Sequence, residues 1–146
     1  MSRKLRNAHY KSTEQILGGS GTVEAGNTAT NPVRLSRTRN ITETGVAIED
    51  GVILATGTYR VSGDVVVEGT TAGDITIQIE DNGTALPETV RTVTVDAGAS
   101  VEITTETVRY WETCCSMQHS LDLVIFSDGT AVADIVLISG NIIKLA

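Results

Sequence analysis

The sequence has few of the residues on which most catalytic and recognition chemistry depends. Aromatic residues make up 3 % of the 146 residues, and there are only two histidines and two cysteines. So few rings leave little material for stacking on nucleic-acid bases or for acid–base catalysis. The two cysteines, Cys114 and Cys115, are adjacent and cannot build a disulfide framework. We therefore expect no enzymatic activity and no disulfide-stabilised scaffold.

Long apolar runs are also missing. No stretch approaches the roughly 20 apolar residues that a membrane-spanning helix needs. The basic residues after Met1 are not followed by an apolar segment, so this region does not have the pattern of a secretory signal. A chain of 146 residues has the usual size of one domain with its own core. We expect neither a membrane partner nor secretion by a signal peptide.

Charge is divided unevenly along the chain. Residues 1–39 hold seven basic and two acidic residues, a balance of +5, whereas residues 40–146 hold four basic and sixteen acidic residues, a balance of −12. The basic part is also rich in residues that favour turns and flexible joints. We therefore divide the chain into a basic, extended N-terminal arm (residues 1–40) that orders on a partner surface and a body (residues 41–146).

The body alternates between apolar and polar residues with the period of a β-strand. This pattern is clear in Thr58–Glu68 and in Asp74–Glu80, where three isoleucines alternate with polar residues. Asp81–Thr84 and Ser127–Thr130 have the residues of hairpin turns. A change of parity near Thr104–Thr105 predicts a bulge. About eight short strands at this spacing indicate an all-β sandwich or barrel.

The last strands are apolar on both faces. Residues 121–126 and 131–138 show this most clearly, and residues 141–146 continue the trend. A strand in a sandwich needs only one buried face, so the second apolar face must be covered by something else. Another copy of the chain is the most economical cover, and we therefore predict an oligomer.

The body resembles a known group of folds. The run Gly57–Val67, with the sequence Gly-Thr-Tyr-Arg-Val-Ser-Gly-Asp-Val-Val-Val, resembles an early strand of the jelly rolls shared by tumour necrosis factor and the complement globular heads. The next strand ends in Asn82-Gly83, and the apolar strands Ala133–Ile138 and Asn141–Leu145 close the chain. The similarity covers residues 45–146. It implies an antiparallel jelly-roll sandwich that forms a homotrimer around a threefold axis. The residues expected at the trimer interface are Tyr59, Tyr110, Phe126, Ile135, Leu137, Ile143 and Leu145.

Complement heads usually follow collagen repeats or a secretion signal, and this sequence shows neither. A basic arm on an all-β trimer instead resembles bacteriophage virion proteins, such as head-decoration proteins and the bases of head fibres. That resemblance implies a structural protein, made in the host cytoplasm, whose arm binds the major capsid protein or another virion protein at the capsid surface. The residues expected to anchor the arm are Arg3, Lys4, Arg6, Lys11, Arg34, Arg37 and Arg39.

The arm leaves other interpretations open. Nucleic acid is a weaker partner, because the acidic body repels a polyanion and no aromatic platform accompanies the basic residues. A solvated, mobile terminus without a partner is a further alternative. Residues 12–17 are compatible with one or two helical turns capped by Ser12.

One cluster of soft ligands is the strongest candidate for a metal site. Cys114, Cys115, Met117 and His119 lie within six residues, and thiolate and thioether ligands suit Cu(I). Their spacing matches no standard zinc pattern. Two small, partly buried thiols in a loop, or a disulfide between subunits near the threefold axis, are the alternatives. We expect no metal and no cofactor.

A different class of function is a receptor-binding or carbohydrate-binding tip of a phage tail or fibre. Its ligand would lie on the loops at residues 69–73 or 96–100, although neither loop has an aromatic residue for stacking on a sugar. A secreted or spore-surface trimer is disfavoured by the missing signal pattern.

Overall fold

The computed structural model describes residues 13–18, 21–35, 38–41, 48–49, 51–113 and 118–146. Eight of the thirteen strands in these residues have four or more residues. In chain order the elements are β1 (Thr13–Gly18), β2 (Thr22–Val23), β3 (Val33–Arg34), β4 (Thr38–Ile41), β5 (Ile48–Glu49), β6 (Val52–Ile53), β7 (Gly57–Thr71), β8 (Gly73–Asp81), β9 (Thr84–Ala85), the 3-10 turn η1 (Pro87–Thr89), β10 (Arg91–Val95), β11 (Ser100–Trp111), β12 (His119–Ser127) and β13 (Val132–Lys144).

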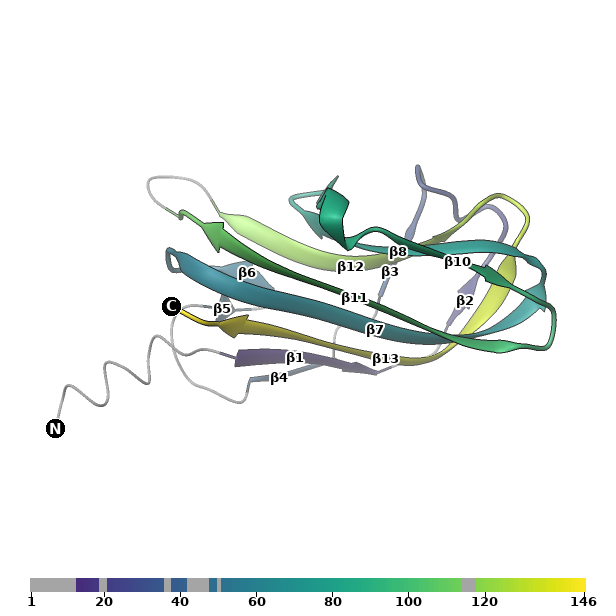
Figure 1. The fold of residues 1–146 in the computed structure, drawn as a ribbon, viewed down its shortest axis with the longest axis horizontal. Coiled ribbons are helices and arrows are strands. Elements are labelled where there is room, and N and C mark those ends of the chain that lie inside the picture. The colour runs from purple at the N-terminus through teal and green to yellow at the C-terminus, as the bar shows by residue number, and fades with distance from the viewer. Residues whose placement is uncertain (1–12, 19–20, 36–37, 42–47, 50, 114–117) are drawn as a thin grey trace, which may run out of the picture.

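The strands form two antiparallel sheets packed face to face (Figure 1). The first sheet has the order β11-β7-β13-β1-β4, with β2 paired to β13. The second has the order β10-β8-β12-β6-β5, with β3 paired to β12 and β9 to β8. Consecutive strands such as β7 and β8, or β12 and β13, belong to different sheets, which is the connectivity of a jelly roll. The expected all-β sandwich is confirmed. Within the described residues, no helix is long and apolar enough to cross a membrane.

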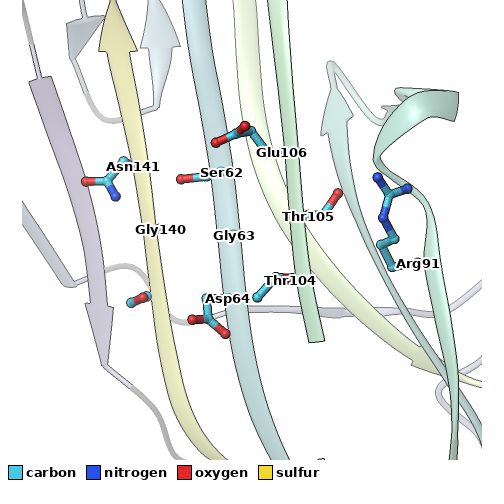
Figure 2. A pocket seen from close by; sticks show the side chains of 10 residues that line it. Ser62, Gly63, Asp64, Arg91, Thr104, Thr105, Glu106, Gly140 and Asn141 are labelled. Atoms are coloured by element: carbon cyan, nitrogen blue, oxygen red, sulfur yellow. The ribbon is translucent and has the colours of Figure 1, made fainter. Parts of the chain in front are cut away.

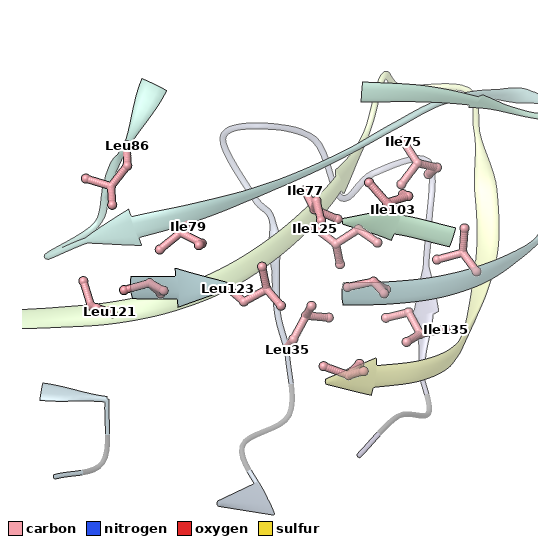
Figure 3. Close-up of a cluster of buried hydrophobic side chains, with 14 of the residues drawn as sticks. Leu35, Ile75, Ile77, Ile79, Leu86, Ile103, Leu121, Leu123, Ile125 and Ile135 are labelled. Atoms are coloured by element: carbon pink, nitrogen blue, oxygen red, sulfur yellow. The ribbon is translucent and has the colours of Figure 1, made fainter. Parts of the chain in front are cut away.

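The core lies between the two sheets, because alternate side chains of each strand point to the same side. Ile75 and Ile77 of β8 and Val65 of β7 are fully buried there. Figure 3 shows side chains from both sheets meeting in this layer, with Leu35 among them. Each such side chain contributes about 1.5–3 kcal/mol when it leaves water. The alternation seen in the sequence is therefore the pattern that builds the core.

The described part of the expected arm belongs to the sandwich. β1 lies between β13 and β4, and its pairing with β13 runs from Thr13 opposite Ile143 to Gly18 opposite Ile138. Val23 and Leu35 are buried in the common core. Residue 40 therefore does not mark the edge of a folded unit. The expected helical turns are wrong for residues 13–17, because pairing with two strands satisfies their backbone in extended form. Residues 1–12 lie outside the described residues.

The bulge expected near Thr104–Thr105 is also wrong. β11 pairs with β7 in one unbroken register over its whole length. The parity changes in the sequence because Thr105 occupies an inward, buried position, whereas Val108 occupies an outward, exposed one. The register shifts instead where β13 pairs with β7, between Val132 and Ala133 and again between Ile135 and Leu137.

Candidate functional site

The outward side of the first sheet carries most of the exposed apolar side chains. We call the outward side chains of β11, β7 and β13, together with Leu145, the outer face. Seven large apolar side chains are exposed in the described part of the chain, and five of them lie on this face. They are Val108, Tyr110, Val136, Leu137 and Leu145, with exposed fractions between 46 and 60 %. A concentration of exposed apolar side chains on one face marks an interaction surface.

The middle of the outer face is polar. Two cross-strand rows form it, Glu106–Ser62–Asn141 and Thr104–Asp64–Ser139. Gly63 and Gly140, which carry no side chain, lie opposite each other between these rows. Together they line a shallow hollow of about 600 Å³, and Arg91 of β10 lines it from the side of the second sheet (Figure 2). The outer face therefore has apolar ends and a polar, open centre.

Carboxyl groups dominate the charge of this centre. Glu102 of β11 and Asp64 of β7 are close neighbours, and the hydrogen bond and negative charge of Asp64 raise the pKa of Glu102. Asp64 Oδ1 is buried and has no hydrogen-bond donor among the described residues. Glu106 has a distant ion pair with Arg60, whose Nε lies 3.9 Å from its Oε1. Three carboxyl groups thus face two guanidinium groups, those of Arg60 and Arg91, which leaves an excess of negative charge.

β11 and β10 are the last strands of the two sheets and form an open edge of the sandwich beside the outer face. The turn η1 holds this edge together. Thr105 Oγ1 of β11 donates a hydrogen bond of 2.5 Å to the carbonyl oxygen of Thr89, and Thr107 Oγ1 donates one of 2.8 Å to Glu88 Oε2. Arg91, at the start of β10, is exposed, and its Nη1 donates to the carbonyl oxygens of Glu88 and Val90 at 3.0 and 2.9 Å. These contacts join the edges of the two sheets and fix the position of Arg91.

The structure separates the residues that were expected at a trimer interface. Tyr110, Leu137 and Leu145 lie on the outer face and are exposed. Tyr59 and Ile135 have exposed fractions of 0 and 5 %, because they take inward positions of β7 and β13. Their own chain covers them, so a folded subunit does not present them to a partner.

Two of the expected interface residues are half-buried. Ile143 follows the outward parity of β13 and joins the outer face, whereas Phe126 lies on β12 in the second sheet. Val124, on the outward side of β12, is fully buried within the chain. The second apolar side of β12 is therefore covered by the chain itself and does not require a partner. The second apolar side of β13 is exposed at Val136. Sequence reasoning did not identify Val108 and Val136 as exposed residues of the outer face. Their outward direction could have been recognised only from the buried positions of their neighbours in β11 and β13.

The expected anchoring residues are not brought together in the described part of the chain. Arg34 pairs within the sandwich, where its Nη1 lies 3.1 Å from Glu80 Oε1 and 3.3 Å from Asp122 Oδ2. Arg39 lies in β4. The others lie outside the described residues, namely Arg3, Lys4, Arg6, Lys11 and Arg37.

A second polar cluster joins three strands at one end of the sandwich. Asp81 Oδ2, at the end of β8, accepts a hydrogen bond of 3.2 Å from Trp111 Nε1 and lies 2.8 Å from His119 Nδ1. The other ring nitrogen of His119 is 2.9 Å from the carbonyl oxygen of Glu112. The ring of Trp111 also packs on the core side chain Tyr59, with centroids 6.0 Å apart. The cluster holds the ends of β8, β11 and β12 together.

The remaining candidates stay predictions. Cys114, Cys115 and Met117 lie outside the described residues, so neither the metal nor the disulfide interpretation is tested. Within the residues that the structure describes, no three His, Cys, Asp or Glu side chains are placed to hold a metal ion. The expected loop at residues 69–73 is instead the end of β7 and the start of β8, with Ala72 between them. It is hydrogen-bonded to the loop that precedes β11 through Gly69 N–H and the Ala99 carbonyl oxygen at 2.8 Å.

Comparison with known proteins identifies the fold. No protein-family model matches the sequence, and no curated protein matches it. Among solved structures, the PRD1 vertex protein P5 is similar with a TM-score of 0.55 and 15 % identity, over 92 % of this chain and 97 % of that chain. The globular domain of zebrafish complement 1qA is similar with a TM-score of 0.50 and 10 % identity, over 93 and 98 % of the two chains. Eiger TNF from S. frugiperda has a TM-score of 0.46, 14 % identity and coverage of 93 % of each chain. The first two of these structures confirm the expected jelly-roll fold, which is the fold of the complement globular domain.

Proposed function

We propose that this chain is a structural protein of a virus particle, a homotrimeric capsid decoration (cement) protein or a head-fibre component. The likeness to the PRD1 vertex protein P5, which extends over 92 % of this chain, supports a place in a virion. None of the three similar structures is named as an enzyme. The proposed role is to assemble with other virion proteins, which needs no catalytic step.

The observation that carries the proposal is the outer face. A single copy leaves Tyr110 and Leu137 with exposed fractions of 60 and 52 % on the same sheet. A second copy would remove such side chains from water, at about 25 cal/mol for each Å² of apolar surface. The resemblance to tumour necrosis factor and complement heads implies that three copies assemble in this way around one axis.

Attachment to the capsid is assigned to the residues that precede β1. Residues 1–12 hold four basic and no acidic residues, and we propose that they bind an acidic surface of the major capsid protein or of another virion protein. A trimer would present three such segments. Weak contacts of each segment would then combine, because binding of the first raises the effective concentration of the other two.

The mass of the full chain in solution tests the assembly. Light scattering should give three times the chain mass of 15.4 kDa, and dilution should reveal the monomer. A monomer at every concentration would contradict the trimer.

The capsid contact has a separate test. Purified capsids of the virus that encodes the chain should sediment together with the full chain and not with a chain that lacks residues 1–12. A matched variant, in which only the four basic residues of that segment are replaced by glutamine, separates charge from chain length. Sedimentation of the shortened chain with the capsid would show that the anchor lies elsewhere. Binding to a glycan array without binding to capsids would instead favour the receptor-binding or carbohydrate-binding tip.

A further inference from the structure

A closed ring of three copies requires two different contact surfaces on each subunit. Only a twofold axis can bring one patch against itself, so each copy in a trimer must offer a second patch to the outer face of its neighbour. The assignment of that second patch rests on the proposed trimer. The patch must complement a face with apolar ends and an acidic centre.

The open edge formed by β10 and β11 is adjacent to the outer face. β11 is the last strand of the first sheet and β10 is the last strand of the second, so the two strands border the same edge of the sandwich. Because β11 belongs both to the face and to the edge, an axis parallel to β11 can place the edge of one copy along the face of the next. Rotation about such an axis does not shift a residue along the direction of β11. A given residue therefore has the same height along the axis in all three copies.

Arg91 stands on this edge at the level of the acidic centre. It lines the same hollow as Thr104 of β11 and Asp64 of β7 (Figure 2). Its Nη1 is fixed by two backbone carbonyl oxygens. Within the described part of the chain, neither its Nε nor its Nη2 donates a hydrogen bond. In Arg109 of the same edge, that pair of donors, Nε and Nη2, binds both oxygens of a carboxylate.

The acidic centre has a carboxyl oxygen that lacks a hydrogen-bond donor within the described part of the chain. Asp64 Oδ1 is buried without a donor among the described residues, and Glu102 is exposed beside it. Two neighbouring carboxyl groups repel each other when both are ionised, and a guanidinium between them removes that cost while making directional hydrogen bonds. Arginine suits this role better than lysine, because its two donors are parallel.

We propose that Arg91 of one copy binds the Asp64 and Glu102 carboxyl groups of the next copy, so that three identical contacts close the trimer. Each subunit gives one guanidinium from its edge and receives one on its outer face. The apolar ends of the face would supply most of the affinity, and this contact would fix the register and direction of the ring.

Charge reversal tests the contact in the full chain. Arg91→Glu and Glu102→Arg should each raise the dissociation constant of the trimer by about tenfold or more, since each places like charges together. The double variant, which exchanges the two charges, should return to within about threefold of the wild type. Arg91→Lys should lie between the wild type and Arg91→Glu. Glu24→Arg makes the same change of charge as Glu102→Arg at an exposed position after β2, outside β10 and β11, and it should leave the mass unchanged.

The outcomes separate this inference from the proposed function. Circular dichroism of each variant establishes that the sandwich is folded before its mass is measured by light scattering. A trimeric wild type with no recovery in the double variant would overturn the Arg91 contact and leave the trimer intact. A wild type that is monomeric at every concentration would overturn both. Trimers of unchanged affinity in both single variants would show that the edge and the acidic centre do not meet.

Discussion

Arg109 and Glu88 form a two-pronged ion pair that joins the edge strand β11 to the turn η1. Arg109 Nη2 lies 3.0 Å from Glu88 Oε1, and its Nε donates to Oε2 of the same carboxylate. The hydrogen bond from Arg109 is the main reason that the pKa of Glu88 is lowered to about 2. Both side chains are 39 % exposed, so water screens the pair and we expect it to contribute about 1 kcal/mol or less.

Acid is therefore expected to weaken the fold. The pKa values of Glu88 and Asp128 are both lowered to about 2, that of Asp128 mainly by a backbone hydrogen bond from Asp74. A carboxylate whose pKa is lower in the folded state stabilises the protein above its unfolded pKa, and this stabilisation is lost as the pH falls through the folded pKa. Urea midpoints at neutral pH and at the pKa of about 2 should show this loss, and Glu88→Gln should reduce it. Glu106→Gln, in an exposed pair at 3.9 Å, is the control and should match the wild type. Equal acid sensitivity of Glu88→Gln and wild type would show that the pair does not stabilise the fold.

Two aspartate substitutions in β13 should have opposite effects although they are two residues apart. Ile135→Asp buries a charge among apolar side chains, because Ile135 is 5 % exposed, and it should unfold the domain. Leu137→Asp places the charge on the outer face, where the side chain is 52 % exposed, so the subunit should fold and the proposed trimer should dissociate. Thermal unfolding followed by circular dichroism, together with light scattering, distinguishes the two. A Leu137→Asp variant that remains fully trimeric would remove this part of β13 from the interface.

A methyl group at Gly140 should separate the two central strands of the first sheet. A Cβ at this position would lie 2.7 Å from the carbonyl oxygen of Ser62 in β7, and backbone cannot move aside as a flexible side chain can. Gly140→Ala should therefore lower the free energy of unfolding by about 1–3 kcal/mol. Gly26→Ala, where a Cβ would meet no atom within 4 Å, should change it by less than about 0.5 kcal/mol. Denaturant unfolding of both variants measures the difference, and equal values would contradict the close approach of β13 and β7.

The carboxylate of Asp81 should be needed for the stability of the end of the sandwich. Asp81→Ala leaves the Trp111 Nε1–H without its acceptor and removes the partner of His119 Nδ1. An unsatisfied buried donor costs about 1–3 kcal/mol. Trp111 is the sole tryptophan, so its fluorescence reports on this end directly during urea unfolding. The exposed Asp96→Ala is the control. A midpoint for Asp81→Ala equal to that of the control would mean that water replaces the carboxylate at no cost.

The long strands of the body could be predicted because one side of each is buried. Residues 58–68 and 74–80 alternate cleanly, and they lie within β7 and β8. The Asn82-Gly83 turn was also visible in the sequence, and both residues have positive φ, of 52° and 85°. Here the local chemistry and the tertiary structure favour the same conformation.

The strands that depend on distant partners could not be predicted in this way. β1 is held by β13 and β4, and nothing within its six residues indicates those neighbours. In β11 an inward position is filled by Thr105, whose hydroxyl donates a hydrogen bond to the carbonyl oxygen of Thr89. The buried side of this strand therefore cannot be recognised from its apolar residues alone. The site was missed for the same reason, because the acidic centre becomes visible only when β11, β7 and β13 are placed in register.

The pairing of β1 with β13 has a consequence for biosynthesis. The first described strand can take its place only after the last one has been synthesised, since it lies between β13 and β4. Contacts between such distant segments form slowly, because closing a long loop has a large entropic cost. The first sheet is therefore completed late, and its outer face is completed with it. A chain interrupted during translation would lack this face, so incomplete subunits would be kept out of the trimer that we propose.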